Sequence, residues 1–166
     1  MMKLIKYNKK RIIITIVVLM LVILLIAGIL FFTHKSVNRV LKSNEFELVS
    51  TVDKGYEFEG IVSEFKVDNY LSKDGKYRCS ITYIDDKNKM EERYNQTLDY
   101  RKKIRLFKDE VKKDNYKYIV YAIEDSTDVG IILNYGNMEI LLLGPEDKNK
   151  KVLEEIIKIL EEENNK

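Results

Sequence analysis

The chain is poor in the residues that most often cross-link a fold or carry out chemistry. Its 166 residues include one Cys, one His, one Pro and no Trp. A single cysteine, Cys79, cannot form a disulfide within the chain, so the fold has to be held by packing. Cys79 lies in a strand-like alternation, where a thiol packs as a small hydrophobe. The lone histidine, His34, has no His or Cys partner, which argues against a histidine-activated nucleophile.

The familiar catalytic and cofactor motifs are also absent. The sequence has no GxxxxGK[ST], GxGxxG, HExxH, GxSxG or CxxC pattern. Asp85-Asp86-Lys87-Asn88 starts like a calcium loop but lacks the required glycine and the twelfth-position Glu, so we interpret it as a loop and helix cap. We therefore expect no cofactor and no metal ion, and we assign no catalytic residue. Carboxylates are plentiful, which leaves an enzyme that works with Asp or Glu as an alternative.

What the sequence does have is one long apolar run from Ile12 to Phe32, interrupted only by Thr15, Ala27 and Gly28. As a helix this run would be about 30 Å long, which matches the hydrocarbon core of a bilayer. It predicts a transmembrane helix over residues 12–33. No small-residue cleavage site follows it, so we expect an uncleaved signal anchor.

Cations around this run predict its orientation and the organisation of the chain. Five precede it and three follow within about fifteen residues, which favours a cytoplasmic amino terminus. Those before the run are Lys3, Lys6, Lys9, Lys10 and Arg11, and those after it are Lys35, Arg39 and Lys42. We expect a bacterial single-pass cell-membrane protein with an extracytoplasmic carboxyl-terminal domain. The predicted parts are a basic tail at 1–11, the span at 12–33, a short tether at 34–44 and the domain at 45–166.

The charge balance excludes a general attraction of this domain to nucleic acid. Five of the 29 Lys and Arg lie before the apolar run, which leaves 24 against 27 Asp and Glu and a net charge of about −3. We therefore expect no nucleic-acid partner.

The first half of the domain alternates as strands do. Period-two patterns predict strands at 45–50 and 61–67, and Asp74-Gly75 predicts a hairpin into a strand at 77–83. Residues 58–65 also fit a helical spacing, which leaves a helix open there. From 87 to 113 the period becomes helical, with one apolar stripe formed by Tyr100, Ile104, Phe107 and Val111.

The second half predicts a three-stranded meander and a closing helix. Strands are expected at 118–123, 129–135 and 138–143, with a Gly136-Asn137 turn. Asp147 or Asn149 is expected to cap the final amphipathic helix. The segment at 36–42 either continues the membrane helix or packs as a first helix. The predicted fold class is α+β: an N-terminal transmembrane helix, then a small domain with a mostly antiparallel sheet of five or six strands and two or three helices.

Two sets of side chains are candidates for binding. The first is a cationic strip at i, i+4, i+7 and i+11 of the predicted long helix, which would suit lipid headgroups or an anionic polymer. It consists of Arg101, Arg105, Lys108 and Lys112. The second is a set of tyrosines in strands, which either line a groove for sugar or peptide or simply pack across strands. They are Tyr77, Tyr83, Tyr118, Tyr121 and Tyr135.

These observations favour a non-enzymatic, membrane-anchored interaction module. Its expected partners are the lipid bilayer and an envelope protein or anionic polymer. The alternatives are a membrane-bound, carboxylate-dependent hydrolase or transferase, and an accessory subunit of a membrane complex.

Overall fold

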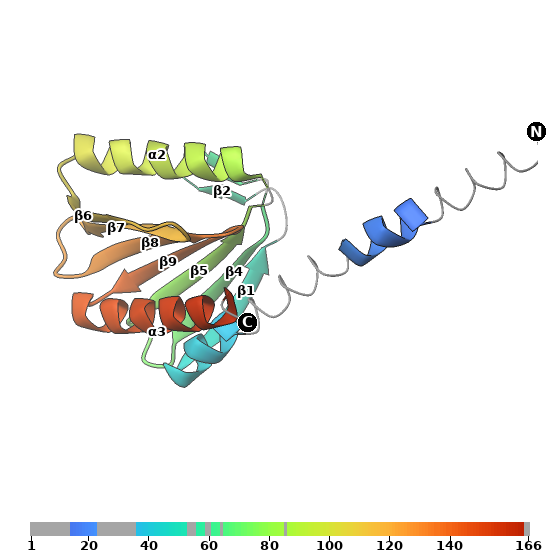
Figure 1. Cartoon of the computed structure of the whole chain (residues 1–166). Coiled ribbons are helices and arrows are strands. Elements are labelled where there is room, and N and C mark those ends of the chain that lie inside the picture. Colours follow the sequence, from blue (N-terminus) through green and yellow to red (C-terminus); the bar gives the residue numbers. More distant parts are fainter. Residues whose placement is uncertain are drawn as a thin grey trace, which may run out of the picture.

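The domain is a seven-stranded antiparallel sheet with helices on both faces (Figure 1). The computed structural model describes residues 14–22, 36–52, 56–58, 61–63, 65–84 and 86–164. One helix, α2 (Lys87–Lys103), lies on one face of the sheet. The other face carries α3 (Glu146–Asn164) and a short helix at residues 36–43. The architecture therefore has three layers.

The strands run in the order β1-β4-β5-β9-β8-β7-β6. Their bounds are β1 Phe46–Val52, β4 Val67–Ser72, β5 Arg78–Tyr83, β6 Phe107–Lys112, β7 Tyr116–Ala122, β8 Val129–Tyr135 and β9 Met138–Gly144. A separate two-stranded sheet pairs β2 (Tyr56–Phe58) with β3 (Ile61–Ser63). From β5 the chain crosses over through α2 to β6 at the far edge, and it then returns strand by strand to place β9 against β5.

The core is built around β8, in which all seven residues are buried. Its sequence is almost continuously apolar, as expected for a strand covered on both faces. On one face Ile131 and Leu133 belong to the same buried cluster as Ile156 of α3. On the other face Ile132 clusters with Tyr94 and Leu98 of α2. Burying each such large apolar side chain contributes about 1.5–3 kcal/mol, so both helices are needed to fold this strand.

The short helix at 36–43 packs into the core of the domain. Val37, Val40 and Leu41 are buried in the cluster on the α3 face. The Tyr70 hydroxyl donates to Asn38 Oδ1 at 2.5 Å, and Asn44 Nδ2, just beyond the helix, donates to Glu155 Oε2 of α3 at 2.6 Å. The segment predicted as a tether therefore takes the packed-helix alternative from residue 36 onward.

The prediction of a transmembrane helix at 12–33 is contradicted. Over the described ranges, no helix is both long and apolar enough to cross a membrane. Residues 14–22 of the run are helical. The flanking parts of the run and His34 lie outside the described residues. The expected cell-membrane localisation, with a cytoplasmic tail and an extracytoplasmic domain, was inferred from this helix and is contradicted by the same finding.

The predicted sheet of five or six strands is also wrong, because residues expected in a helix form an edge strand. The helix α2 ends at Lys103, and Arg105 adopts a left-handed φ of 60° before β6 begins. The expected stripe does not pack as predicted: Tyr100 is 50% exposed, and α2 instead buries Met90, Tyr94 and Leu98. The error has a simple cause, since a spacing of four residues fits both a helix face and one face of a strand.

Several local predictions are confirmed. The hairpin at Asp74-Gly75 joins β4 to β5, with Gly75 at φ 72°, and Gly136 at φ 56° turns β8 into β9. The three-stranded meander also forms as predicted, and β6 extends it to four strands. The closing helix α3 begins at Glu146, directly after Pro145. Asn149 does not cap it; its buried amide donates to the carbonyl oxygens of Val129 and Gly144 and so ties α3 to the sheet.

Gly130 provides a test of this packing. A Cβ added there would lie 2.1 Å from Cζ of Tyr121, a ring that is itself buried. We expect Gly130→Ala to lower the free energy of unfolding by about 1–3 kcal/mol, because the ring has to be displaced. Urea denaturation measures this loss. In a Tyr121→Leu background the same substitution should cost clearly less, and an equal cost in both backgrounds would contradict the clash.

Candidate functional site

The structure disperses the four cations of the predicted strip. Arg101 lies in the last turn of α2, with its guanidinium carbon 4.1 Å from the centroid of the Tyr121 ring. Arg105 follows the helix and is exposed, whereas Lys108 and Lys112 lie on β6. The four residues therefore do not form one helix face.

The two lysines of β6 are bound to opposite layers. Lys108 Nζ donates to Glu146 Oε2 of α3 at 2.8 Å. Lys112 Nζ lies 3.0 Å from Glu110 Oε1, which also accepts the Tyr94 hydroxyl of α2 at 3.1 Å. Burial alone would raise the pKa of Glu110, but the hydrogen bonds from Lys112 and Tyr94 outweigh it and lower that pKa. Anion binding by the strip stays a prediction, and the described contacts do not assemble it.

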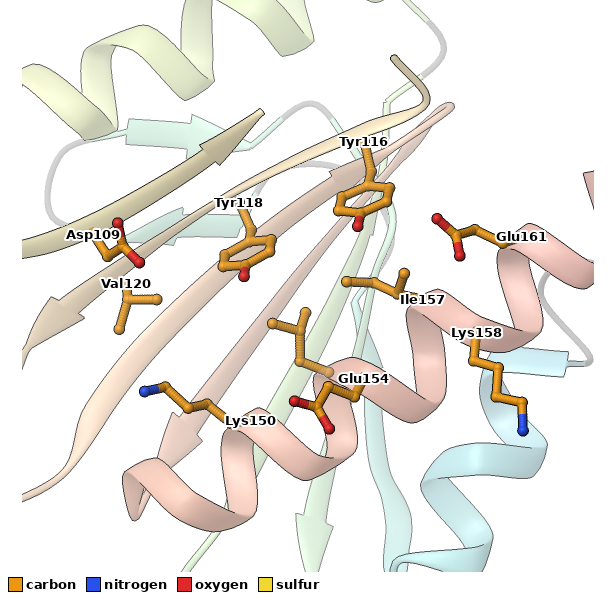
Figure 2. A pocket seen from close by; sticks show the side chains of 10 residues that line it. Asp109, Tyr116, Tyr118, Val120, Lys150, Glu154, Ile157, Lys158 and Glu161 are labelled. Carbon is orange, nitrogen blue, oxygen red and sulfur yellow. The ribbon is translucent and has the colours of Figure 1, made fainter. Parts of the chain in front are cut away.

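The structure instead forms a groove between β7 and α3, on the opposite side of the sheet from α2 (Figure 2). Its volume is about 290 Å³. We call it the tyrosine groove. It is lined by Asp109, Tyr116, Tyr118, Val120, Lys150, Leu153, Glu154, Ile157, Lys158 and Glu161.

The groove exists because α3 covers only part of this face of the sheet. It packs mainly on β8 and β9, so Tyr116 and Tyr118 of β7 are only partly covered on this face. Alternate residues of a strand share one face. Tyr116, Tyr118 and Val120 therefore point together toward the space beside α3, where Leu153 and Ile157 form the opposite wall.

Tyr116 and Tyr118 form a flat aromatic surface in the groove. Their ring centroids are 6.4 Å apart and their planes differ by only 7°. Figure 2 shows the two rings side by side on β7, across the groove from α3. Both side chains pack against the core cluster on this face but remain partly exposed.

The lining of the groove has a small excess of negative charge, with three carboxylates against two lysines. Three carboxylates line the groove, those of Asp109, Glu154 and Glu161. Of the two lysines, Lys150 is paired with Glu146 at 2.7 Å, and Figure 2 shows the Lys158 amine pointing away from the rings. The pKa of Tyr118 is raised, first by partial burial and then by the charge of Asp109.

This arrangement suits binding better than catalysis. Glu154 and Glu161 lie on one helix, two turns or about 10 Å apart along its axis, and the groove contains no Ser, Cys or His. Throughout the described ranges, no three His, Cys, Asp or Glu side chains are placed to hold a metal ion. An aromatic surface with nearby carboxylates is instead suited to hold a cationic group.

Sequence reasoning named Tyr118 as a strand aromatic but missed Tyr116 and the wall from α3. A signal was present, since Tyr116 and Tyr118 are two residues apart in a strand and therefore share a face. Only the position of α3 decides which aromatic pairs in the sheet stay uncovered.

The comparisons with known proteins concern the fold. No protein-family model matches the sequence, and no curated protein matches it significantly. Among solved structures, the chain is similar to a GTP binding regulator from Thermotoga maritima, with a TM-score of 0.50 and 11% sequence identity. The similarity covers 77% of this chain and 87% of that one. At this identity the likeness shows the fold alone.

The pair of lysines around Glu146 gives a pH-dependent prediction. Hydrogen bonds from Lys108 and Lys150 lower the pKa of Glu146 from 4.5 to about 2. A lowered folded-state pKa stabilises the fold above the unfolded value, and this contribution is lost as the pH falls through about 2. We expect Glu146→Gln to be slightly less stable than the parent at pH 7, since the pair is exposed. The difference, measured by urea denaturation, should shrink steadily from pH 4.5 toward pH 2.

Glu162→Gln, an exposed change on the same helix, is the matched control and should show no such trend. A Glu146→Gln difference that is constant over this pH range would contradict the ion-pair explanation.

Proposed function

We propose that this domain is a non-catalytic binding module that takes a Lys or Arg side chain of a protein partner into the tyrosine groove. The observation that carries the proposal is the nearly parallel Tyr116–Tyr118 pair beside three carboxylates. A guanidinium or ammonium group is attracted to the ring face, and a carboxylate next to it supplies charge-assisted hydrogen bonds. Arg fits this site best, because its planar group stacks on a ring while it binds a carboxylate.

The same chemistry already occurs within the chain. Lys148 Nζ lies 3.8 Å from the centroid of the Tyr77 ring, and Arg101 lies over Tyr121 at 4.1 Å. In both cases a tyrosine face in this fold accepts a cation. The rings of Tyr116 and Tyr118 have no such intramolecular cation among the described contacts, which supports a cation supplied by a partner.

The groove also lies beside an edge of the sheet. The strand β6 pairs with β7 alone, so its outer edge has unpaired backbone groups within the described sheet. An extended segment can add to such an edge by backbone hydrogen bonds. A partner strand running along β6 would place every second side chain on the same face of the sheet as the groove, from which a long Arg or Lys side chain extends toward β7. This supports an extended, basic peptide as the occupant.

No specific observation favours the alternatives. A carboxylate-dependent hydrolase or transferase would need converging acids, whereas Glu154 and Glu161 are spread along α3. The Thermotoga regulator is described as binding GTP, but a phosphate chain is disfavoured next to three carboxylates.

The test is a titration of the ¹⁵N-labelled protein with the peptide acetyl-Arg-Val-Arg-Val-Arg-amide, followed by NMR. We expect shifts confined to β6, β7 and the groove side of α3. Tyr118→Ala should weaken binding about two- to fivefold, as expected for one exposed cation–π contact. Glu161→Gln should weaken it to a similar degree.

Tyr100→Ala and Glu92→Gln are matched controls, because both residues are exposed on α2 on the other side of the sheet. Equal weakening by Tyr100→Ala and Tyr118→Ala would refute the proposal. So would equal binding of the Glu-for-Arg peptide, or tighter binding of cellotetraose, which would identify the rings as a sugar site.

A further inference from the structure

A second cavity lies on the α2 side of the sheet and shares one lining residue, Tyr116, with the tyrosine groove. Its volume is about 310 Å³, and it is formed where the first turns of α2 meet the β6–β7 turn. Lys87 and Met90 line it from α2, and Lys113 and Asp114 line it from the turn. Its most unusual lining residue is Asn134, which lies near the end of the buried strand β8, beside the turn at Gly136.

Asn134 is a buried amide without a protein partner. The residue is 4% exposed, and neither Oδ1 nor Nδ2 makes a hydrogen bond within the described chain. Burying an amide without a partner costs free energy, so native structures rarely contain one. An Asn retained among the apolar residues of β8 therefore needs an explanation.

The polar neighbours of Asn134 do not provide its partner. Lys117 and Glu139 flank it in register on β7 and β9. Lys117 Nζ donates to Glu91 and lies 4.1 Å from the centroid of the Tyr94 ring. Glu139 Oε1 accepts from Arg93 Nε at 2.8 Å. Both neighbours are thus held by α2, whereas the amide between them, which also lines the cavity, has no hydrogen-bond partner among the described residues.

We propose that this cavity binds, through Asn134, a small ligand that carries an anionic group. A carboxamide offers a donor and an acceptor side by side, so it pairs best with a planar group that presents the complementary pair. Lys87 and Lys113 are exposed and form no ion pair among the described residues. The carboxylates of the lining are Asp114 and Glu91, and Glu91 is already paired with Lys117, so the two lysines exceed the remaining Asp114 in charge. They are placed to hold an anionic group of the same ligand. The volume is at the lower end for ligand sites, which limits the ligand to a small molecule.

Two kinds of metabolite share this chemistry. A mononucleotide carries a base edge with adjacent donor and acceptor, together with a phosphate. Free glutamine carries a carboxamide together with a carboxylate. The inference rests on Asn134, Lys87 and Lys113, none of which lines the tyrosine groove, so it stands or falls independently of the proposed function.

The experiment follows the side-chain amide resonance of Asn134 in the ¹⁵N-labelled full chain. The probes are UMP, GMP, AMP, CMP, glutamine and ribose 5-phosphate, each titrated separately. We expect at least one nucleotide or glutamine to shift the Asn134 side-chain amide together with the backbone of residues 113–117. Which of these probes succeeds distinguishes a nucleotide site from an amino-acid site. Ribose 5-phosphate, which lacks the planar edge, should leave the amide unshifted.

Two substitutions then test the role of Asn134. Asn134→Leu should weaken binding of the successful probe about tenfold, since two hydrogen bonds are lost. It should also raise the urea midpoint, because an unpartnered amide is removed from the interior. Asn134→Asp keeps an acceptor but loses the donor, and it should likewise weaken binding. Asn95→Leu, on an exposed position of α2, should change binding by less than about twofold.

Three results would overturn the proposal. The first is that none of the six probes shifts the Asn134 amide. The second is that its amide protons show contacts to bound water alone at every probe concentration. The third is that Asn134→Leu lowers the urea midpoint, which would show that the amide already has a stabilising partner in the free protein.

Discussion

The structure depends on covering β8 on both of its faces. Every residue of this strand is buried. A sheet cannot cover its own faces, so helices have to pack on both of them (Figure 1). The chain supplies α2 for one face and α3 for the other, with the short helix at 36–43 beside α3. Both candidate sites lie where these helices leave part of the sheet uncovered. The tyrosine groove lies where α3 covers β7 only in part, and the Asn134 cavity lies where α2 begins.

The two faces of the sheet have different chemistry. The α3 face is almost entirely apolar around β8 and becomes aromatic and acidic at β7. The α2 face carries a polar row across three strands, formed by Lys117, Asn134 and Glu139. Buried polar groups are tolerated when each has a partner. The helix α2 provides partners for the two ends of the row, Arg93 for Glu139 and Glu91 with Tyr94 for Lys117. The residue at the centre of the row, Asn134, has no such partner within the described chain.

Local signals predicted much of the fold. Glycines that need a positive φ marked the turns after β4 and β8, and continuous apolar runs marked β7, β8 and β9. The helix-to-strand switch at Arg105 was missed, because apolar residues four apart satisfy either structure. The expectation of a membrane span came from hydropathy alone and is corrected by the helices of the described chain. The candidate site could not be predicted as a whole, since Tyr116 and Glu161 are 45 residues apart in the sequence and come together only across the groove between β7 and α3.

The sequence by itself determined the local elements: two helices, the hairpins, and a set of strands too apolar to remain uncovered. It also determined that this chain lacks the usual catalytic motifs. Tertiary structure alone decided which side chains meet. The spacing of Arg101, Arg105, Lys108 and Lys112 indicated one cationic strip, but the chain reversal at Arg105 distributes these residues between two layers. Conversely, the tyrosine groove is lined by residues that share no spacing in the sequence. They come together only because β7 and α3 lie next to each other in the fold.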